Sequence, residues 1–360
     1  MPTSKPRARD LGIPLEGKTG KYNAITDVDG ITVGYSTIIE GESARTGVTI
    51  IHPRGKNNHD PVFAGWFPFN GNGEMTGSAW VEEGGFLEGP IGITNTHSVG
   101  VVRDTIIQWQ AKQGKMFQHW SCPVVTETAD GWLNDMNGFF VKPHHVWEAL
   151  ENAESGSVAE GAVGGGTGML CYEFKGGSGT SSRKLPEKFG GWTVGAFAQT
   201  NFGMRYQLTV AGVPVGHHLK EHPVWSDGEN PWQESGSLII VLATDAPLLP
   251  HQLKRMAKRA SLGMARTGSL GGNGSGDIFI AFSTANPNTA LQGDKQVVEL
   301  RALDNDHLNP LFGASVFATE EAILNSLVAG EDMMGHKGFS VKGLPHEALR
   351  EVMREYNRIQ

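Results

Sequence analysis

The dipeptide Gly236-Ser237 has the residue types that self-cleavage of a chain requires. A serine hydroxyl is a weak nucleophile until a base removes its proton. If the bond before Ser237 is cut, its own α-amine, with a pKa of about 7.7 to 8.0 in peptides, serves as that base. Glycine at position 236 removes side-chain bulk and permits unusual backbone dihedrals. The alternative interpretation, an ordinary turn that enters a strand, is the commoner meaning of a Gly-Ser dipeptide.

The segments on either side of this dipeptide differ sharply in composition. Residues 217–236 are polar and are broken by Pro223 and Pro231. Loops of this length without regular structure are uncommon in compact domains unless they have a function. Residues 237–244 are almost entirely apolar, which is typical of a strand covered on both faces. We therefore expect Ser237 to begin a central strand.

Ser275 and Asp277 form a second candidate cluster, within the segment 273–277 that precedes an apolar run at 278–282. If this run and the strand after Ser237 are neighbours, the hydroxyl and carboxylate groups hydrogen-bond the nucleophile and its amine. The alternative interpretation is a glycine-rich turn, because Asn, Gly, Ser and Asp concentrate in turns.

Short strands and amphipathic helices must position these residues. The expected strands are 30–35, 47–51, 61–67, 169–174, 192–200, 237–244 and 277–283. Residues 205–215 are expected to complete a hairpin with the strand 192–200. The expected helices lie near 99–109, 145–153, 250–268, 309–329 and 349–356. Helices and strands that alternate around buried strands indicate a layered α/β architecture, and residues 1–360 fit one large domain.

Composition and charge argue against several classes of partner. The net charge is −8, and no basic stripe is interleaved with aromatic residues, so nucleic acid is not an expected partner. No stretch approaches the roughly 18 apolar residues of a membrane span. No apolar region follows the basic residues of the N-terminus. We therefore expect a cytoplasmic protein without a membrane partner.

Neither a metal nor a cofactor is expected. The histidine pairs at 144–145 and 217–218 lack an acidic partner at metal-ligand spacing. The glycine-rich segment 164–168 lacks the Lys-Ser/Thr that follows a phosphate-binding loop, so a tight turn is the better interpretation.

Segments 236–248 and 273–277 closely resemble those of the L-aminopeptidase D-amidase/D-esterase family, which also contains the β-peptidyl aminopeptidases. Segments 92–100, 163–169 and 318–324 match in the same order, so the resemblance covers nearly the whole chain.

The resemblance implies a role for each matching residue. Ser237 corresponds to the nucleophile that autoproteolysis exposes after Gly236, and Ser275 and Asp277 correspond to the residues that orient it. Asn201 corresponds to the side-chain donor to the oxyanion, and its alternative interpretation is a turn residue. A side-chain donor of this kind is typically worth about 10²–10³ in rate.

Glu127 corresponds to the carboxylate that binds the free ammonium group of the substrate, and its alternative interpretation is a surface acid. The family fold is a four-layer αββα sandwich that is shared with the ornithine acetyltransferases. Members are cleaved, here into residues 1–236 and 237–360, and assemble as homotetramers. The resemblance implies a hydrolase that removes N-terminal residues from small peptides, amides or esters.

Three other functions remain open. A preference for β-amino-acid N-termini is an alternative within the family. Acyl transfer, as in the related acetyltransferases, is another, but those enzymes use a threonine nucleophile, and Ser237 argues against it. The third is an uncleaved and inactive homologue, which the intact motif disfavours.

Overall fold

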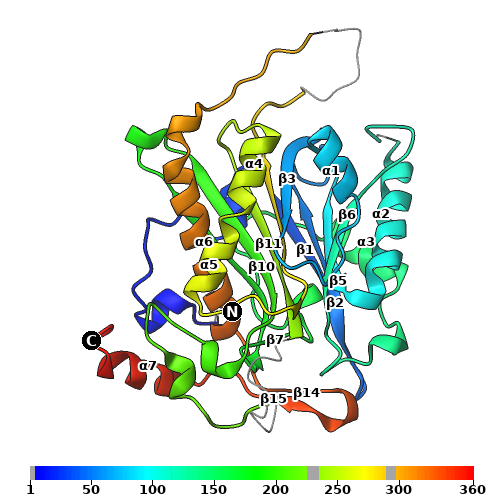
Figure 1. The fold of residues 1–360 in the computed structure, drawn as a ribbon. Helices are drawn as coiled ribbons and strands as arrows, with labels where there is room; N and C mark the ends of the chain where they lie inside the picture. Colours follow the sequence, from blue (N-terminus) through cyan, green and yellow to red (C-terminus); the bar gives the residue numbers. More distant parts are fainter. Residues whose placement is uncertain (1–4, 115, 225–234, 289–296) are drawn as a thin grey trace.

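The computed structural model describes residues 5–114, 116–224, 235–288 and 297–360 (Figure 1). Residues 225–234, half of the polar loop predicted before Ser237, lie outside the described residues, and Pro231 is among them.

Two β-sheets form the centre of the molecule. The first has the order β1 (Thr32–Glu40), β2 (Ala44–His52), β5 (Ile91–Asn95), β6 (Val124–Thr128). The second has the order β4 (Phe86–Leu87), β3 (Val62–Pro68), β13 (Ile278–Ser283), β11 (Ser235–Thr244), β10 (Thr193–Asn201), β9 (Gly177–Lys184), with the short β12 (Gly274–Ser275) paired to β11. The predicted central strand is therefore present. It pairs antiparallel with β10 and parallel with β13.

The apolar run in β11 is explained by burial of both its faces. Successive side chains of a strand point to opposite faces of the sheet. Ile239 and Val241 belong to the apolar core between the two sheets. Leu238 and Ile240 belong to the core between the second sheet and its covering helices. Because both faces are dry, the strand needs no alternation of polar and apolar residues.

Helices cover the outer face of each sheet (Figure 1). The first sheet packs against α2 (Val99–Gln113) and α3 (Pro143–Glu151). The second packs against α4 (Pro250–Ala257), α5 (Ala260–Arg266) and α6 (Asn309–Val328). The remaining elements are α1 (Ser78–Gly84), α7 (His346–Glu355) and the small hairpins β7 (Leu170–Cys171) with β8 (Phe174–Lys175) and β14 (Met333–Met334) with β15 (Ser340–Val341).

The sequence analysis found no stretch that approaches a membrane span, but the helix α6 is long and apolar enough to cross a membrane by length and composition alone. In this fold 83% of its most apolar window is buried inside the protein. Its apolar surface is therefore that of a core helix.

One predicted hairpin is wrong. Residues 205–215 form no strand beside β10; they contain the 3-10 turns Arg205–Gln207 and Val215–His217 and one isolated bridge. The partner of β10 on that side is β9, whose sequence Gly-Ser-Gly-Thr-Ser-Ser-Arg-Lys lacks the apolar residues that strand patterns look for. A side-chain Cβ built at Gly179 would lie 2.0 Å from the carbonyl oxygen of Ala322 in α6. Close approach of α6 thus explains the small residues of β9.

Two other predicted elements are interrupted. The strand predicted at 169–174 is the hairpin β7–β8, which turns at Tyr172 and Glu173 with positive φ angles of 50° and 60°. The helix predicted at 250–268 is divided into α4 and α5.

Replacing Gly179 with alanine tests the close approach of α6 to β9. We expect Gly179→Ala to lower the free energy of unfolding by about 1–3 kcal/mol, because the added methyl group overpacks a dry interface. Gly100 is the matched control, since a Cβ there meets no atom within 4 Å. Urea unfolding of both variants measures the difference, and equal midpoints for the two would contradict the packing described here.

Candidate active site

Ser237 lies near the start of β11, where three strands meet. It is opposite Asn201 in the antiparallel pair with β10, while Gly236 is opposite Ser275 in the parallel pair with β12. The side chain is nearly buried, with 3% of its surface exposed. The pairing therefore brings together residues that are up to 74 positions apart in the chain, from Asn201 to Ser275.

The carbonyl oxygen of Gly236 accepts two hydrogen bonds. The Ser237 hydroxyl donates to it at 2.7 Å, and the backbone N–H of Gly276 donates at 2.9 Å. Donors directed at a carbonyl oxygen stabilise the negative charge that develops when its carbon is attacked. The carbonyl group of the bond predicted to be cut therefore has a backbone donor at its oxygen and the Ser237 hydroxyl beside it.

Glycine is required at position 236 for a different reason than the sequence indicated. Gly236 is not among the glycines with positive φ. A Cβ at this position would lie 2.3 Å from the carbonyl oxygen of Asn201 and 2.9 Å from the Cα of Phe202. Close approach of the neighbouring backbone, and not an unusual dihedral, excludes a side chain here.

Ser275 and Asp277 are fully buried beside the start of β11. The Ser275 hydroxyl donates to Oδ1 of Asp277 at 2.7 Å. The other carboxylate oxygen, Oδ2, accepts from Nδ2 of Asn70 at 2.8 Å, and the Asp277 N–H donates to Oδ1 of Asn70 at 2.6 Å. The predicted pair is therefore one chain of hydrogen bonds that fixes the Ser275 hydroxyl next to Gly236.

Glu127 is a buried acid and not a surface one. It lies on β6 and is 2% exposed. Oε1 accepts from the backbone N–H of Glu74 at 3.0 Å, and Oε2 accepts from the hydroxyl of Thr96. Burial raises the pKa of Glu127, although these two hydrogen bonds oppose the shift. A buried carboxylate with its remaining lone pairs directed at a cavity is suited to bind an ammonium group.

The Asn201 side chain is fixed at the end of β10. Its Oδ1 accepts from the N–H of Leu170 at 3.0 Å, and its Nδ2 donates to the carbonyl oxygen of Ala129 at 2.9 Å. A primary amide has two N–H groups, so a second donor remains for a ligand.

A cavity of about 550 Å³ joins these groups. It is lined by Ser237, Glu127 and Asn201 together with Asn72, Gly73, Glu74, Thr96, Ala129, Gly131, Trp132, Met136, Leu170, Glu173, Phe202, Gly203, Gly236 and Gly274. The ionisable groups on its wall are all carboxylates, since no Lys, Arg or His from the described part of the chain lines it. Such a wall attracts cations.

The sequence patterns gave no role to Asn70, Asn72 or Glu74, which support this cavity. Asn70 and Asn72 follow β3, and β3 pairs with β13 so that its end lies beside the loop that carries Asp277. Thr96 and Glu74 hold the Glu127 carboxylate. The Asn-Gly-Asn-Gly run at 70–73 was a detectable signal of a tight loop, but only the pairing of distant strands shows what it contacts.

The comparison with known proteins fits this geometry. The sequence profile of peptidase family S58 matches residues 23–341. This chain belongs to peptidase family S58. The beta-peptidyl aminopeptidases BapA of Sphingosinicella microcystinivorans and Sphingosinicella xenopeptidilytica are 51% and 45% identical to it. The alignments cover 98% and 97% of this chain and 93% and 91% of those proteins.

Solved structures of S58-like enzymes are similar over their whole length. A Burkholderia sp. beta-aminopeptidase has a TM-score of 0.91 at 47% identity, and the alignment covers 97% of this chain and 99% of that enzyme's chain. The L-aminopeptidase D-Ala-esterase/amidase of Ochrobactrum anthropi has a TM-score of 0.92 at 47% identity, with 99% and 100% covered. The latter is described as a prototype of the serine aminopeptidases with a variant Ntn-hydrolase fold. The resemblance seen in the sequence is therefore confirmed, and the S58 chain is a hydrolase of peptide or amide bonds with a mixed α/β fold.

Asn70→Ala tests whether the buried hydrogen-bond chain supports hydrolysis. The substitution removes the hydrogen bond from Asn70 Nδ2 to Asp277 Oδ2, and a hydrogen bond to a charged group is worth about 1.5–3 kcal/mol. We expect kcat for an amide substrate to fall about 10-fold or more, which corresponds to roughly 1.4 kcal/mol.

Asn72→Ala is the matched control in the same loop. Within the part of the chain that the structure describes, its amide donates to the carbonyl oxygen of Gly274 and not to the Asp277 carboxylate. A loss of kcat as large in Asn72→Ala as in Asn70→Ala would contradict a special role for the bond to Asp277.

Proposed function

We propose that the chain is a serine aminopeptidase and amidase that first cuts its own bond between Gly236 and Ser237. The observation that carries the proposal is the convergence of the Ser237 hydroxyl and the Gly276 N–H on the Gly236 carbonyl group. The products are fragments 1–236 and 237–360.

The cleavage proceeds in two steps with balanced atoms. Ser237 Oγ attacks the carbonyl carbon of Gly236, and the Gly276 N–H stabilises the oxyanion. The C–N bond breaks, and the hydroxyl proton ends on the nitrogen that becomes the α-amine. Water then hydrolyses the resulting ester, which gives a carboxylate on Gly236 and restores the Ser237 hydroxyl.

Substrate hydrolysis uses the group that cleavage creates. The α-amine of Ser237 takes the hydroxyl proton and later gives it to the leaving amine. The second N–H of Asn201 Nδ2 donates to the oxyanion of the tetrahedral intermediate. Ser275, which is fixed by Asp277, orients the nucleophile and its amine. Water hydrolyses the acyl-enzyme to complete the turnover.

Glu127 gives the site its selectivity for a free N-terminus. Its buried carboxylate binds the substrate ammonium, and the neighbouring acids Glu74 and Glu173 line the same cavity. The relatives named as beta-peptidyl aminopeptidases support β-amino-acid N-termini as a second candidate specificity. A serine at position 237, where the acetyltransferases use threonine, argues against acyl transfer to a second amine.

The finer features of the fold and assembly belong to the same proposal. The order of helices, sheet, sheet and helices supports the four-layer αββα sandwich that the family resemblance implies. The relation of this fold to the ornithine acetyltransferases and a homotetramer of cleaved protomers are proposed from that resemblance alone, and a cytoplasmic location is proposed from the composition of the chain.

Ser237→Ala tests the cleavage. Wild-type protein is expected to give two bands on a denaturing gel, and N-terminal sequencing of the smaller fragment should begin Ser-Leu-Ile. Ser237→Ala should remain full-length and inactive, because no hydroxyl is present to attack Gly236. A cut at the same bond in this variant would show that another group performs the cleavage.

A pair of substrates tests the ammonium site. We expect an alanyl anilide with a free amine to be hydrolysed with a kcat/KM at least about 10²-fold higher than its N-acetyl form, because the acetylated form leaves a buried carboxylate unpaired. Glu127→Gln should remove most of this discrimination. Because burial raises the pKa of Glu127, the wild-type preference should weaken on acidification before an ordinary glutamate would protonate. Equal kcat/KM for the two substrates would rule out an aminopeptidase.

A further inference from the structure

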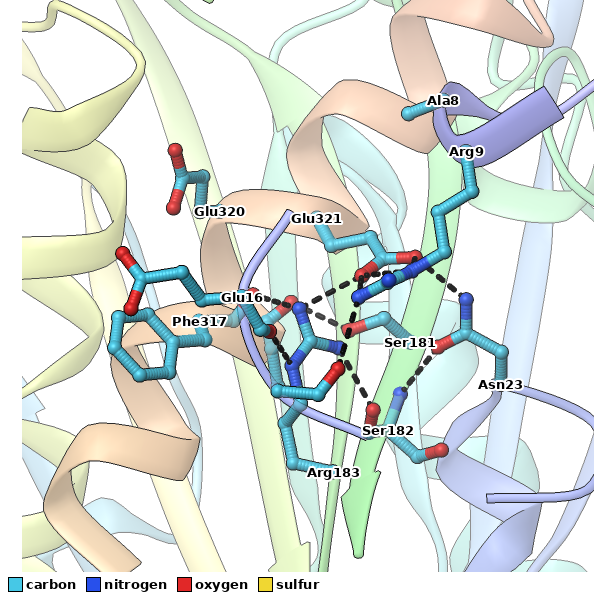
Figure 2. Close-up of polar contacts among 12 residues, drawn as sticks. Ala8, Arg9, Glu16, Asn23, Ser181, Ser182, Arg183, Phe317, Glu320 and Glu321 are labelled. Atoms are coloured by element: carbon cyan, nitrogen blue, oxygen red, sulfur yellow. Dashed lines mark hydrogen bonds and ion pairs between the residues drawn. The ribbon is translucent and has the colours of Figure 1, made fainter. Parts of the chain in front are cut away.

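A second cluster of buried charges lies outside the active-site cavity, between β9, α6 and the N-terminal segment (Figure 2). At its centre is Glu321 of α6, whose side chain is fully buried. Arg9 and Arg183 donate to its carboxylate, and so does the side-chain amide of Asn23. We call these four residues the Glu321 network.

The hydrogen bonds of the Glu321 network are short, and most donors and acceptors of its side chains are used. Arg9 Nη2 and Arg183 Nη2 lie 2.8 and 2.7 Å from Oε2 of Glu321, and Asn23 Nδ2 lies 2.6 Å from Oε1. The guanidinium group of Arg183 also donates to the backbone oxygens of Glu16, Ser182 and Phe317. Burial alone would raise the pKa of Glu321, but Arg9 and Arg183 outweigh it and hold the pKa below its usual range. The carboxylate is therefore ionised and depends on its donors.

The network has one property that the fold alone does not require: its partners lie on opposite sides of residue 237. Arg9, Asn23 and Arg183 precede the proposed cut, whereas Glu321 follows it. Three further buried bonds cross in the same place, from Ser181 Oγ to the oxygen of Ala318, from the Ala8 N–H to Asn325 Oδ1, and from Asn325 Nδ2 to the oxygen of Thr180.

Separation of the two fragments would break all of these hydrogen bonds at once. Within the assembled protein the carboxylate and the guanidinium groups depend on each other, because removing one partner of a buried ion pair leaves the other charge uncompensated and is strongly destabilising. The shared apolar core and the β10–β11 and β3–β13 strand pairs also cross the cut, and the Glu321 network adds charge-assisted hydrogen bonds to them.

We propose that the Glu321 network is a clamp between the two fragments of the cleaved protein, in which the larger fragment supplies the cations and the smaller one the anion. This inference rests on the cleavage proposed above. It assigns the network a function that begins only when the covalent link is lost, which is to slow the separation of the fragment that carries Asn201 from the fragment that carries Ser237.

Exchange of the small fragment between unlabelled and isotope-labelled cleaved protein, followed by native mass spectrometry, tests the clamp. We expect Glu321→Gln to exchange at least 10-fold faster than wild type, because the amide cannot neutralise Arg9 and Arg183. Glu320→Gln is the matched control. Glu320 is the adjacent acid on the same helix and is also nearly buried, but its ion-pair partner Arg266 lies in the same fragment. The pair of Arg266 with Glu16 across the cut is solvent-exposed, and Glu320→Gln leaves both of its residues in place. Its exchange should match that of wild type.

A milder variant covers the case in which Glu321→Gln does not fold. Arg9 is 33% exposed, and Arg9→Gln leaves the pair of Arg183 and Glu321 in place. It should exchange faster than wild type and Glu320→Gln. Exchange at the wild-type rate in every folded Glu321 and Arg9 variant overturns the clamp while the cleavage stands. A wild-type protein that remains one uncut chain overturns the cleavage and the clamp together.

Discussion

β11 is hydrogen-bonded on both sides from its first residues, and the arrangement of the active site depends on this pairing. On one side β10 places Asn201 opposite Ser237. On the other, β12 and β13 place Ser275 opposite Gly236 and carry Asp277 between them. A shift of one residue in either pairing would turn every side chain to the opposite face. The two dry cores on either side of β11 prevent that shift, so apolar packing fixes the polar geometry.

The sequence predicted the parts of this arrangement that are local. The apolar run after Ser237 identified the central strand, and the spacing of Val99, Val102, Ile106 and Trp109 identified α2, because periodicity records which faces are buried. The position of the nucleophile and of Asp277 followed from the resemblance. Glu127 and Asn201 were placed by the same means, and the structure brings both to the wall of one cavity with Ser237.

The parts that were missed depend on contacts between distant segments. β9 has no apolar strand pattern, because its residues must be small where α6 packs closely against it. α6 lies more than a hundred positions later in the chain. Asn70 has no local reason to bind Asp277, because the two meet only through the β3–β13 pair. Buried carboxyl groups show the same limit. Glu127 and Glu321 are both nearly inaccessible, yet the pKa of the first is raised and that of the second lowered, because only Glu321 has guanidinium partners.

The depth of Ser237 has a consequence for a cell that makes this hydrolase. Ser237 is 3% exposed, and the cavity of about 550 Å³ beside it has room for only a few residues of a substrate. A folded protein cannot thread an internal loop into such a space, and the acidic wall offers nothing to the middle of a chain, which has no charged terminus. With the proposed ammonium site, the enzyme would therefore leave folded neighbouring proteins intact and act on small peptides and amides.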